Sequence, residues 1–287
     1  MDGLELTAAS HRDRFTTQGK RSAIRACFQQ KRRELPPGAA APVLQGRNVY
    51  GTPRLPKKPG VCVFNRLHDS RAWFGEHKQE YQSYVIAPLR QLVLDLTPTM
   101  LELDPHFTTE PRGDRTICRI WRDTRYTKDP SLYRDHMWII FKRGGRMHGT
   151  DYPGMYFEIN LDGFSYGCGF YHASTPFLQH MRTKILQGDP DFQKAQAAYL
   201  QQRVFQMEGE CFKRPHYGDR PPEEQLWLER RNISFNGTSH DFPLLFSPDL
   251  SKKVAEDLRL LFPVYRFLLS TAEETLQQET AQNLLQR

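Results

Sequence analysis

The chain has 287 residues, of which 38% are hydrophobic and 12% aromatic, which is enough apolar content for a sizeable core in one domain. Its formal charge of +7 is uneven: residues 1–60 hold 12 Lys and Arg against 4 Asp and Glu, a balance of +8, while residues 61–287 hold 28 against 29, a balance of −1. A broad basic face on the body is therefore excluded, and any anion site there must be a local cluster.

Residues 1–60 are polar, basic and rich in proline and glycine. This composition predicts a flexible basic extension that is disordered, and such a segment is a candidate for binding nucleic acid. The alternatives are a solvated tail and a start codon placed too far upstream. We expect residues 61–275 to form one domain and residues 276–287 to form a C-terminal helical tail.

A helix is predicted from Ser70 onwards, with Ser70 as its N-cap. Pro88 is expected to kink this helix or to restart it. The apolar residues recur at steps of three and four, namely Trp73, Phe74, His77, Tyr81, Tyr84, Val85, Leu89, Leu92 and Leu96.

Short β-like runs follow at 116–122, 136–143, 154–160 and 163–171. The last two flank Leu161-Asp162-Gly163, and Asp-Gly between such runs predicts a hairpin.

Three further helices are predicted from Pro-containing starts at Thr175-Pro176, Asp189-Pro190 and Ser247-Pro248, the last with a kink at Pro263. Two short strands are expected near 204–208 and 233–235. Strands grouped in the middle and helices at both ends predict an α+β fold with a mainly antiparallel sheet.

The segment Arg119–Tyr133 reads R-I-W-R-D-T-R-Y-T-K-D-P-S-L-Y and carries the densest group of cations in the body. Three hypotheses compete for it. The cations bind a phosphate or carboxylate, they form a structural ion network with the nearby aspartates, or they are solvated. In the first, Asp123 orients an arginine or acts as a catalytic base, and Tyr133 donates a hydrogen bond to the ligand. The cations that would hold the anion are Arg119, Arg122, Arg125 and Lys128.

The standard enzyme signatures are absent: there is no G-x-S-x-G, no glycine-rich phosphate loop and no G-x-G-x-x-G. No cofactor is expected, and the histidines lack metal-ligand spacing, so no metal site is expected. Five widely spaced cysteines without C-x-x-C, and no secretory or membrane-spanning apolar run, predict a cytoplasmic protein without membrane association. Whether the chain is an enzyme, and its oligomeric state, stay open.

Several motifs together resemble the bacterial and fungal family catalogued as domain of unknown function 2461. Arg119-x-x-Arg122-Asp123-x-Arg125-Tyr126, with Tyr133 seven residues later, is similar to its signature R-x-x-R-D-x-R-F-x-x-x-K-x-x-Y. Arg71-Ala72-Trp73-Phe74 is similar to the R-x-W-F of its helix, and the predicted hairpin is similar to its own. Pro130 departs from the signature lysine, and His68-Asp69 departs from a pair of asparagines.

This resemblance covers about residues 67–268 and implies a single α+β domain, but no reaction. From the residues, we expect an uncharacterised protein that binds or acts on a small anionic, phosphorylated ligand through the cluster. The alternative is a non-catalytic interaction protein that binds nucleic acid or a protein partner, with the cluster structural.

Overall fold

A computed structural model describes residues 68–125, 128–144 and 150–285, so the predicted extension 1–60 lies outside the described residues. The helices and strands are α3 (Arg71–Tyr81), the π-helical η1 (Gln82–Ile86), α4 (Ala87–Leu103), β1 (Met137–Lys142), β2 (Gly154–Ile159), β3 (Phe164–Gly169), α5 (Thr175–Leu186), α6 (Pro190–Gln201), β4 (Gln206–Glu208), α7 (Pro222–Leu228), β5 (Ser234–Ser239), α8 (Phe242–Leu245), α9 (Leu250–Arg259) and α10 (Phe262–Leu285).

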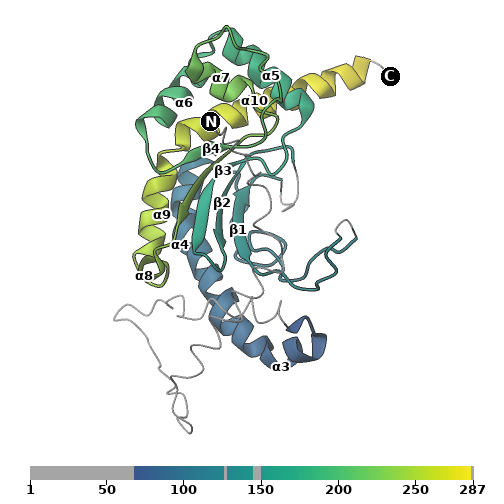
Figure 1. The fold of residues 1–287 in the computed structure, drawn as a ribbon, viewed down its shortest axis with the longest axis vertical. Coiled ribbons are helices and arrows are strands. Elements are labelled where there is room, and N and C mark those ends of the chain that lie inside the picture. Colours follow the sequence, from purple (N-terminus) through teal and green to yellow (C-terminus); the bar gives the residue numbers. More distant parts are fainter. Residues whose placement is uncertain (1–67, 126–127, 145–149, 286–287) are drawn as a thin grey trace, which may run out of the picture. The chain divides into compact units, whose positions relative to one another are not determined.

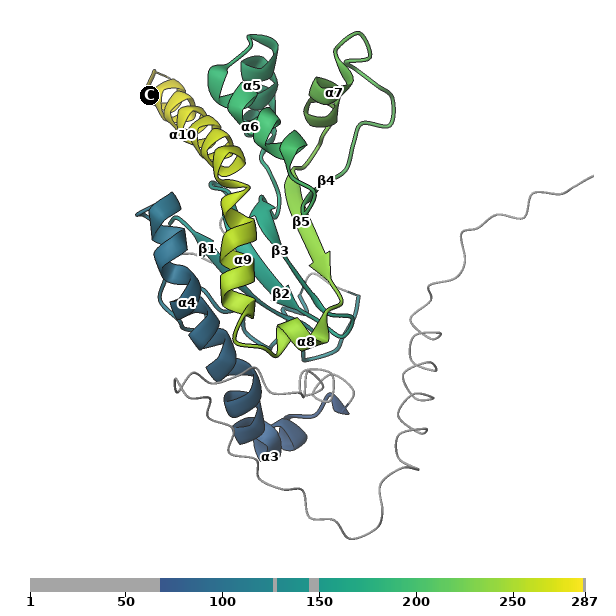
Figure 2. The same ribbon diagram turned by 90° about the vertical axis from the view of Figure 1, so that its left-hand side faces the viewer.

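The described strands form one antiparallel sheet in the order β1-β2-β3-β5-β4. Helices α4, α9 and α10 pack against one of its faces (Figures 1 and 2). Alternate side chains of the strands point to that face, and in register Ile139, Phe157 and Tyr166 are all buried there. Strands in the middle and helices before and after them confirm the predicted α+β fold.

The first predicted helix is confirmed as the consecutive elements α3, η1 and α4, and a new α-helical element starts beside Pro88, in agreement with the predicted restart. The Ser70 hydroxyl accepts a hydrogen bond from the amide of Trp73 at 3.4 Å, as an N-cap does. The π turn η1 directly precedes Pro88, which lies in the first turn of α4. Because proline has no N–H to donate to the preceding turn, a widened turn accommodates it without ending the helix.

The predicted hairpin is confirmed, since Ile159 pairs with Phe164 around Gly163, whose φ of +144° suits glycine. The helix predicted from Thr175-Pro176 is confirmed as α5, with Ser174 as its N-cap. The prediction for the final helix needs correction, because it starts at Leu250 rather than at Ser247-Pro248 and is divided into α9 and α10 by residues 260–261 rather than kinked at Pro263. Helix α7 was not predicted, because its seven residues are too few to show a periodic apolar pattern.

The run 116–122 also differs from its prediction as a strand. It forms only isolated bridges, Ile117 with Ile139 of β1 and Trp121 with Tyr133. Residues 116–122 thus contact β1 only through Ile117, and their other end pairs with the segment at Tyr133 that leads into β1.

A buried ionic network links α4, the end of β1 and α10. The Asp104 carboxylate is fully buried and accepts hydrogen bonds from Arg143 Nε and the Tyr265 hydroxyl, each at 2.6 Å, and from the amide of His106 at 3.0 Å. Arg143 also pairs with Glu273 of α10. Every oxygen of the buried carboxylate is therefore satisfied, as a buried charge requires.

Candidate functional site

The segment 119–133, hereafter the arginine loop, is a hairpin-like loop whose two ends are joined by backbone hydrogen bonds. The amide of Arg122 donates to the carbonyl of Leu132, and the amide of Arg134 donates to that of Ile120, both at 2.8 Å. The Asp69 carboxylate, just before α3, accepts a hydrogen bond from the amide of Leu132 at 2.6 Å. The loop is thereby fixed against the start of α3 although 63 residues separate the two partners.

An aromatic cluster forms the base of the loop. The ring of Trp121 lies 4.6 Å from that of Tyr133 and 5.5 Å from that of Phe74 on α3, measured between centroids. Tyr133 is fully buried, its hydroxyl donates to the carbonyl of Ser70 at 3.4 Å, and burial raises its pKa. These contacts give Tyr133 a role in packing, while its predicted hydrogen bond to a ligand stays a prediction.

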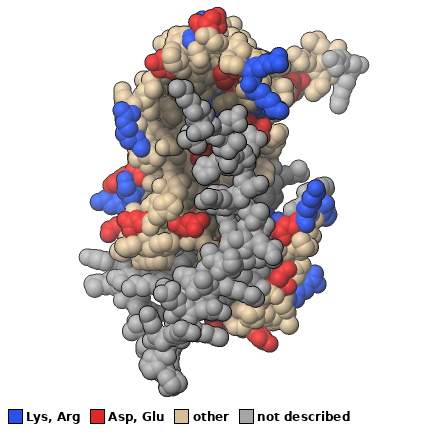
Figure 3. Space-filling view, viewed as in Figure 1, with Lys and Arg blue, Asp and Glu red and all other residues tan. Residues whose placement is uncertain are grey.

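Each of the three arginines of the loop has its own carboxylate. Arg119 Nε lies 2.7 Å from Asp114, and Arg122 pairs with Asp129. Arg125 donates from Nε and from an NH2 nitrogen to the two oxygens of Asp123, at 3.0 and 2.7 Å. Figure 3 shows Lys and Arg side chains interleaved with Asp and Glu at the right of the view, where the loop projects in Figure 1.

The arginines differ in exposure, which separates their roles. The side chain of Arg122 is only 17% exposed, whereas those of Arg119 and Arg125 are 65% and 76% exposed. Lys128 is exposed as well. Arg122 and Asp129 therefore form part of the framework of the loop, and the solvent-facing cations are Arg119, Arg125 and Lys128.

Asp123 is held ionised by its partner. Hydrogen bonds from the side chain and amide of Arg125 lower the pKa of Asp123 to about 2. A general base works best with a pKa near the working pH, so this carboxylate is a weak proton acceptor at neutral pH. Its geometry supports the orienting role of the two roles predicted for it.

Sequence reasoning missed the acidic partners Asp69, Asp114 and Asp129. Asp129 had a local signal, because Asp129-Pro130-Ser131 is a turn sequence, and its carboxylate accepts from the amide and hydroxyl of Ser131. Asp114 has a φ of +65°, a backbone conformation that aspartate tolerates better than most residues. For Asp69 the signal was the family's pair of asparagines at positions 68 and 69, but it did not indicate the partner, which lies 63 residues away.

The arginines near the start of β5 do not belong to this site. Strand β1 starts directly after the arginine loop, and β5 runs antiparallel to it, so the residues before β5 lie at the opposite end of the sheet. There, Arg230 donates to the carbonyl of Gly209 at 2.7 Å, and the Arg182 guanidinium lies 4.9 Å over the ring of Phe212. These arginines hold the loop before α7 in place.

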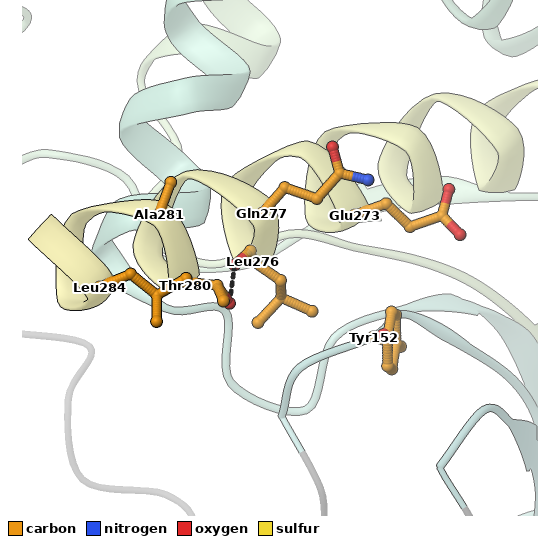
Figure 4. Close-up of a pocket in the computed structure, with 7 residues that line it drawn as sticks. All are labelled: Tyr152, Glu273, Leu276, Gln277, Thr280, Ala281 and Leu284. Carbon is orange, nitrogen blue, oxygen red and sulfur yellow. Dashed lines mark hydrogen bonds between the residues drawn. The ribbon is translucent and has the colours of Figure 1, made fainter.

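A shallow hollow lies at that same opposite end, between Tyr152 and the C-terminal half of α10 (Figure 4). Tyr152 comes just before β2, which starts beside the end of β1. In Figure 4 the side chain of Leu276 points towards Tyr152. The hollow therefore contains none of the predicted site residues.

The described residues give no sign of a metal site, since no three His, Cys, Asp or Glu side chains among them are grouped as ligands. Of the helices in this described part, none is both long and apolar enough to cross a bilayer.

Comparison with known proteins gives one match. No curated protein matches the chain, and no solved structure matches it. The family model described as "Conserved hypothetical protein (DUF2461)" matches residues 65–267, which include the arginine loop, the start of α3 and the whole sheet. The match covers well over half of the chain, and the chain therefore belongs to the DUF2461 family.

Proposed function

We propose that the arginine loop binds a small anionic ligand that carries phosphate. The observation that supports this is the exposure of Arg119, whose side chain is 65% exposed although its Nε lies 2.7 Å from Asp114 in an ion pair. A guanidinium has five N–H donors in a rigid fork, so an ion pair with one carboxylate does not use all of them. A second exposed guanidinium, that of Arg125, is fixed by Asp123 close along the chain.

Phosphate suits this arrangement better than a single carboxylate does. A phosphate ester carries about 1.5 to 2 negative charges and three acceptor oxygens at neutral pH, and can therefore engage two guanidinium groups at once. Asp123 and Asp114 hold the two arginines in place before the ligand arrives, which reduces the entropy lost on binding. Lys128 adds a third exposed cation.

The first test is a thermal-shift titration of the full chain with pyrophosphate at about 0.15 M salt, where long-range attraction is screened. Pyrophosphate at 100 times its dissociation constant adds about 2.7 kcal/mol to the free energy of unfolding. For a domain of this size the melting temperature then rises by roughly 5–10 °C. A melting temperature that does not change up to millimolar pyrophosphate would refute the proposal.

The second test uses the double variant Arg119→Ala/Arg125→Ala, which removes the two most exposed arginines and should leave the fold intact. Its matched control is Arg231→Ala, which removes an exposed arginine paired with Glu210 at the opposite end of the sheet. We expect the double variant to lose the shift and the control to keep it. An equal shift in all three proteins would place the anion elsewhere.

A second candidate function is that of a non-catalytic interaction protein in which the arginine loop is structural. The pairing of each of the three arginines with a carboxylate, and the burial of Arg122, favour it. Arg122→Ala should then lower the melting temperature much more than Arg125→Ala, and neither variant should alter ligand binding. Binding of nucleic acid through residues 1–60 stays a prediction, tested by a steep salt dependence that deletion of those residues abolishes.

A further inference from the structure

Trp121 is a large apolar side chain that is partly exposed, at 39% of its surface, at the base of the arginine loop. Tyr133 and Phe74 pack against it, and Phe74 meets it edge to face. The indole is thus held rigidly by two aromatic rings while part of it faces water. A rigid exposed aromatic ring is costly to leave in water and is a common stacking surface for a planar partner.

The backbone places this ring beside the exposed cations. Burial alternates from Cys118 to Trp121, so that Cys118 and Ile120 are buried and Arg119 and Trp121 face outwards on the same side. The positive charge of Arg119 also reaches Asp123, the partner of Arg125. Arg119 and Trp121 therefore lie on one exposed side of the chain, and the exposed Arg125 follows four residues after Trp121.

We infer that the ligand of the arginine loop carries a planar aromatic base as well as phosphate, and that it is a nucleotide. This inference rests on the proposed function. The base stacks on Trp121, and the phosphates bind Arg119 and Arg125. A purine and a pyrimidine nucleotide both bind, because stacking on an indole uses the face of the base and not its hydrogen-bonding edge.

The neighbouring tryptophan, Trp73, does not offer such a surface. His68 and His77 stack on it, with ring centroids at 4.5 and 3.9 Å and nearly parallel planes. A base on Trp73 would have to displace an imidazole, whereas no imidazole stacks on Trp121 among the described residues.

The experiment compares ADP, UDP and pyrophosphate by isothermal titration calorimetry on the full chain. We expect both nucleotides to bind at least about fivefold more tightly than pyrophosphate, since stacking of one base on an aromatic ring contributes about 1–3 kcal/mol. In Trp121→Leu this advantage should disappear while the affinity for pyrophosphate is unchanged. Trp121→Phe, which keeps an aromatic face, should retain most of it.

The control is Trp138→Leu, which removes a half-buried tryptophan of β1 that lies under the guanidinium of Arg134. Its affinity for ADP should equal that of the wild type. If nucleotides and pyrophosphate bind equally well, or if Trp121→Leu weakens all three ligands alike, the inference is wrong and the anion site stands. If pyrophosphate itself does not bind, the proposed function fails and the inference fails with it.

Discussion

Replacement of Asp104 with asparagine should destabilise the fold more than any single change in the arginine loop. Asp104 is fully buried, and its carboxylate accepts hydrogen bonds from Arg143 and from the Tyr265 hydroxyl, each at 2.6 Å. Asparagine keeps the shape of the side chain and one acceptor oxygen but removes the charge. Arg143, only 19% exposed, would keep Glu273 alone as its anionic partner.

The expected loss is about 3–5 kcal/mol, the usual cost of removing one partner of a buried ion pair. Tyr265→Phe removes one hydrogen bond to the same carboxylate and leaves the ion pair, so its loss should be smaller, about 1.5–3 kcal/mol. Asp104→Asn should lose more stability than Tyr265→Phe, because only Asp104→Asn removes the carboxylate charge that lies beside the guanidinium of Arg143.

Equilibrium unfolding in urea, followed by circular dichroism, measures both losses on the full chain. Asp123→Asn is the control, because it removes an exposed carboxylate that pairs with the exposed Arg125. A midpoint for Asp104→Asn within error of the wild-type midpoint, with an unchanged slope, would refute the reasoning about this network.

The same prediction has a pH dependence of known sign. Burial raises the pKa of Asp104, but the hydrogen bonds from Arg143 and Tyr265 outweigh it, so the pKa lies below its ordinary value. A carboxyl with a lowered pKa contributes stability above its unfolded pKa of about 3.9, and loses it as pH falls through the folded pKa. The difference between wild type and Asp104→Asn should therefore be full at pH 7 and should shrink below about pH 4.

Two further predictions concern glycine and cysteine. In Gly167→Ala the added Cβ would lie 1.8 Å from the carbonyl oxygen of Phe235 on β5, so β3 and β5 would have to separate. We expect the variant to be insoluble when expressed or to melt at a much lower temperature than the wild type. A variant as stable as the wild type would contradict the strand register. After maleimide treatment of the native chain, peptide mapping should find Cys211 labelled, whereas the buried Cys118 and Cys168 should be labelled only in denaturant. Burial excludes the reagent from both thiols and raises the pKa of Cys118 to about 12.

Much of the secondary structure follows from signals within a few residues. Ser70 caps α3, Asp189 caps α6, and Asp162-Gly163 turns between β2 and β3, as predicted. Each of these signals acts through a hydrogen bond or a dihedral angle inside one turn of chain, so the local sequence contains all the information that is needed.

The pairing of charges depended on the tertiary structure. The sequence placed Arg119, Arg122 and Arg125 together with Asp123, but it left open which carboxylate each arginine takes. No helix or strand was predicted for the segment that carries Asp114, and the loop is fixed by Asp69, whose partner is 63 residues away.

The same limit applies to the aromatic residues of the hairpin. Phe164 and Tyr166 are buried against the helices, whereas Tyr171 is 95% exposed. Alternation along a strand determines which residues share a face, but which face is buried depends on where α4, α9 and α10 pack. The local chemistry of this chain is thus encoded residue by residue, whereas burial and ion pairing arise only when distant segments meet, because both depend on contacts that no short stretch of sequence contains.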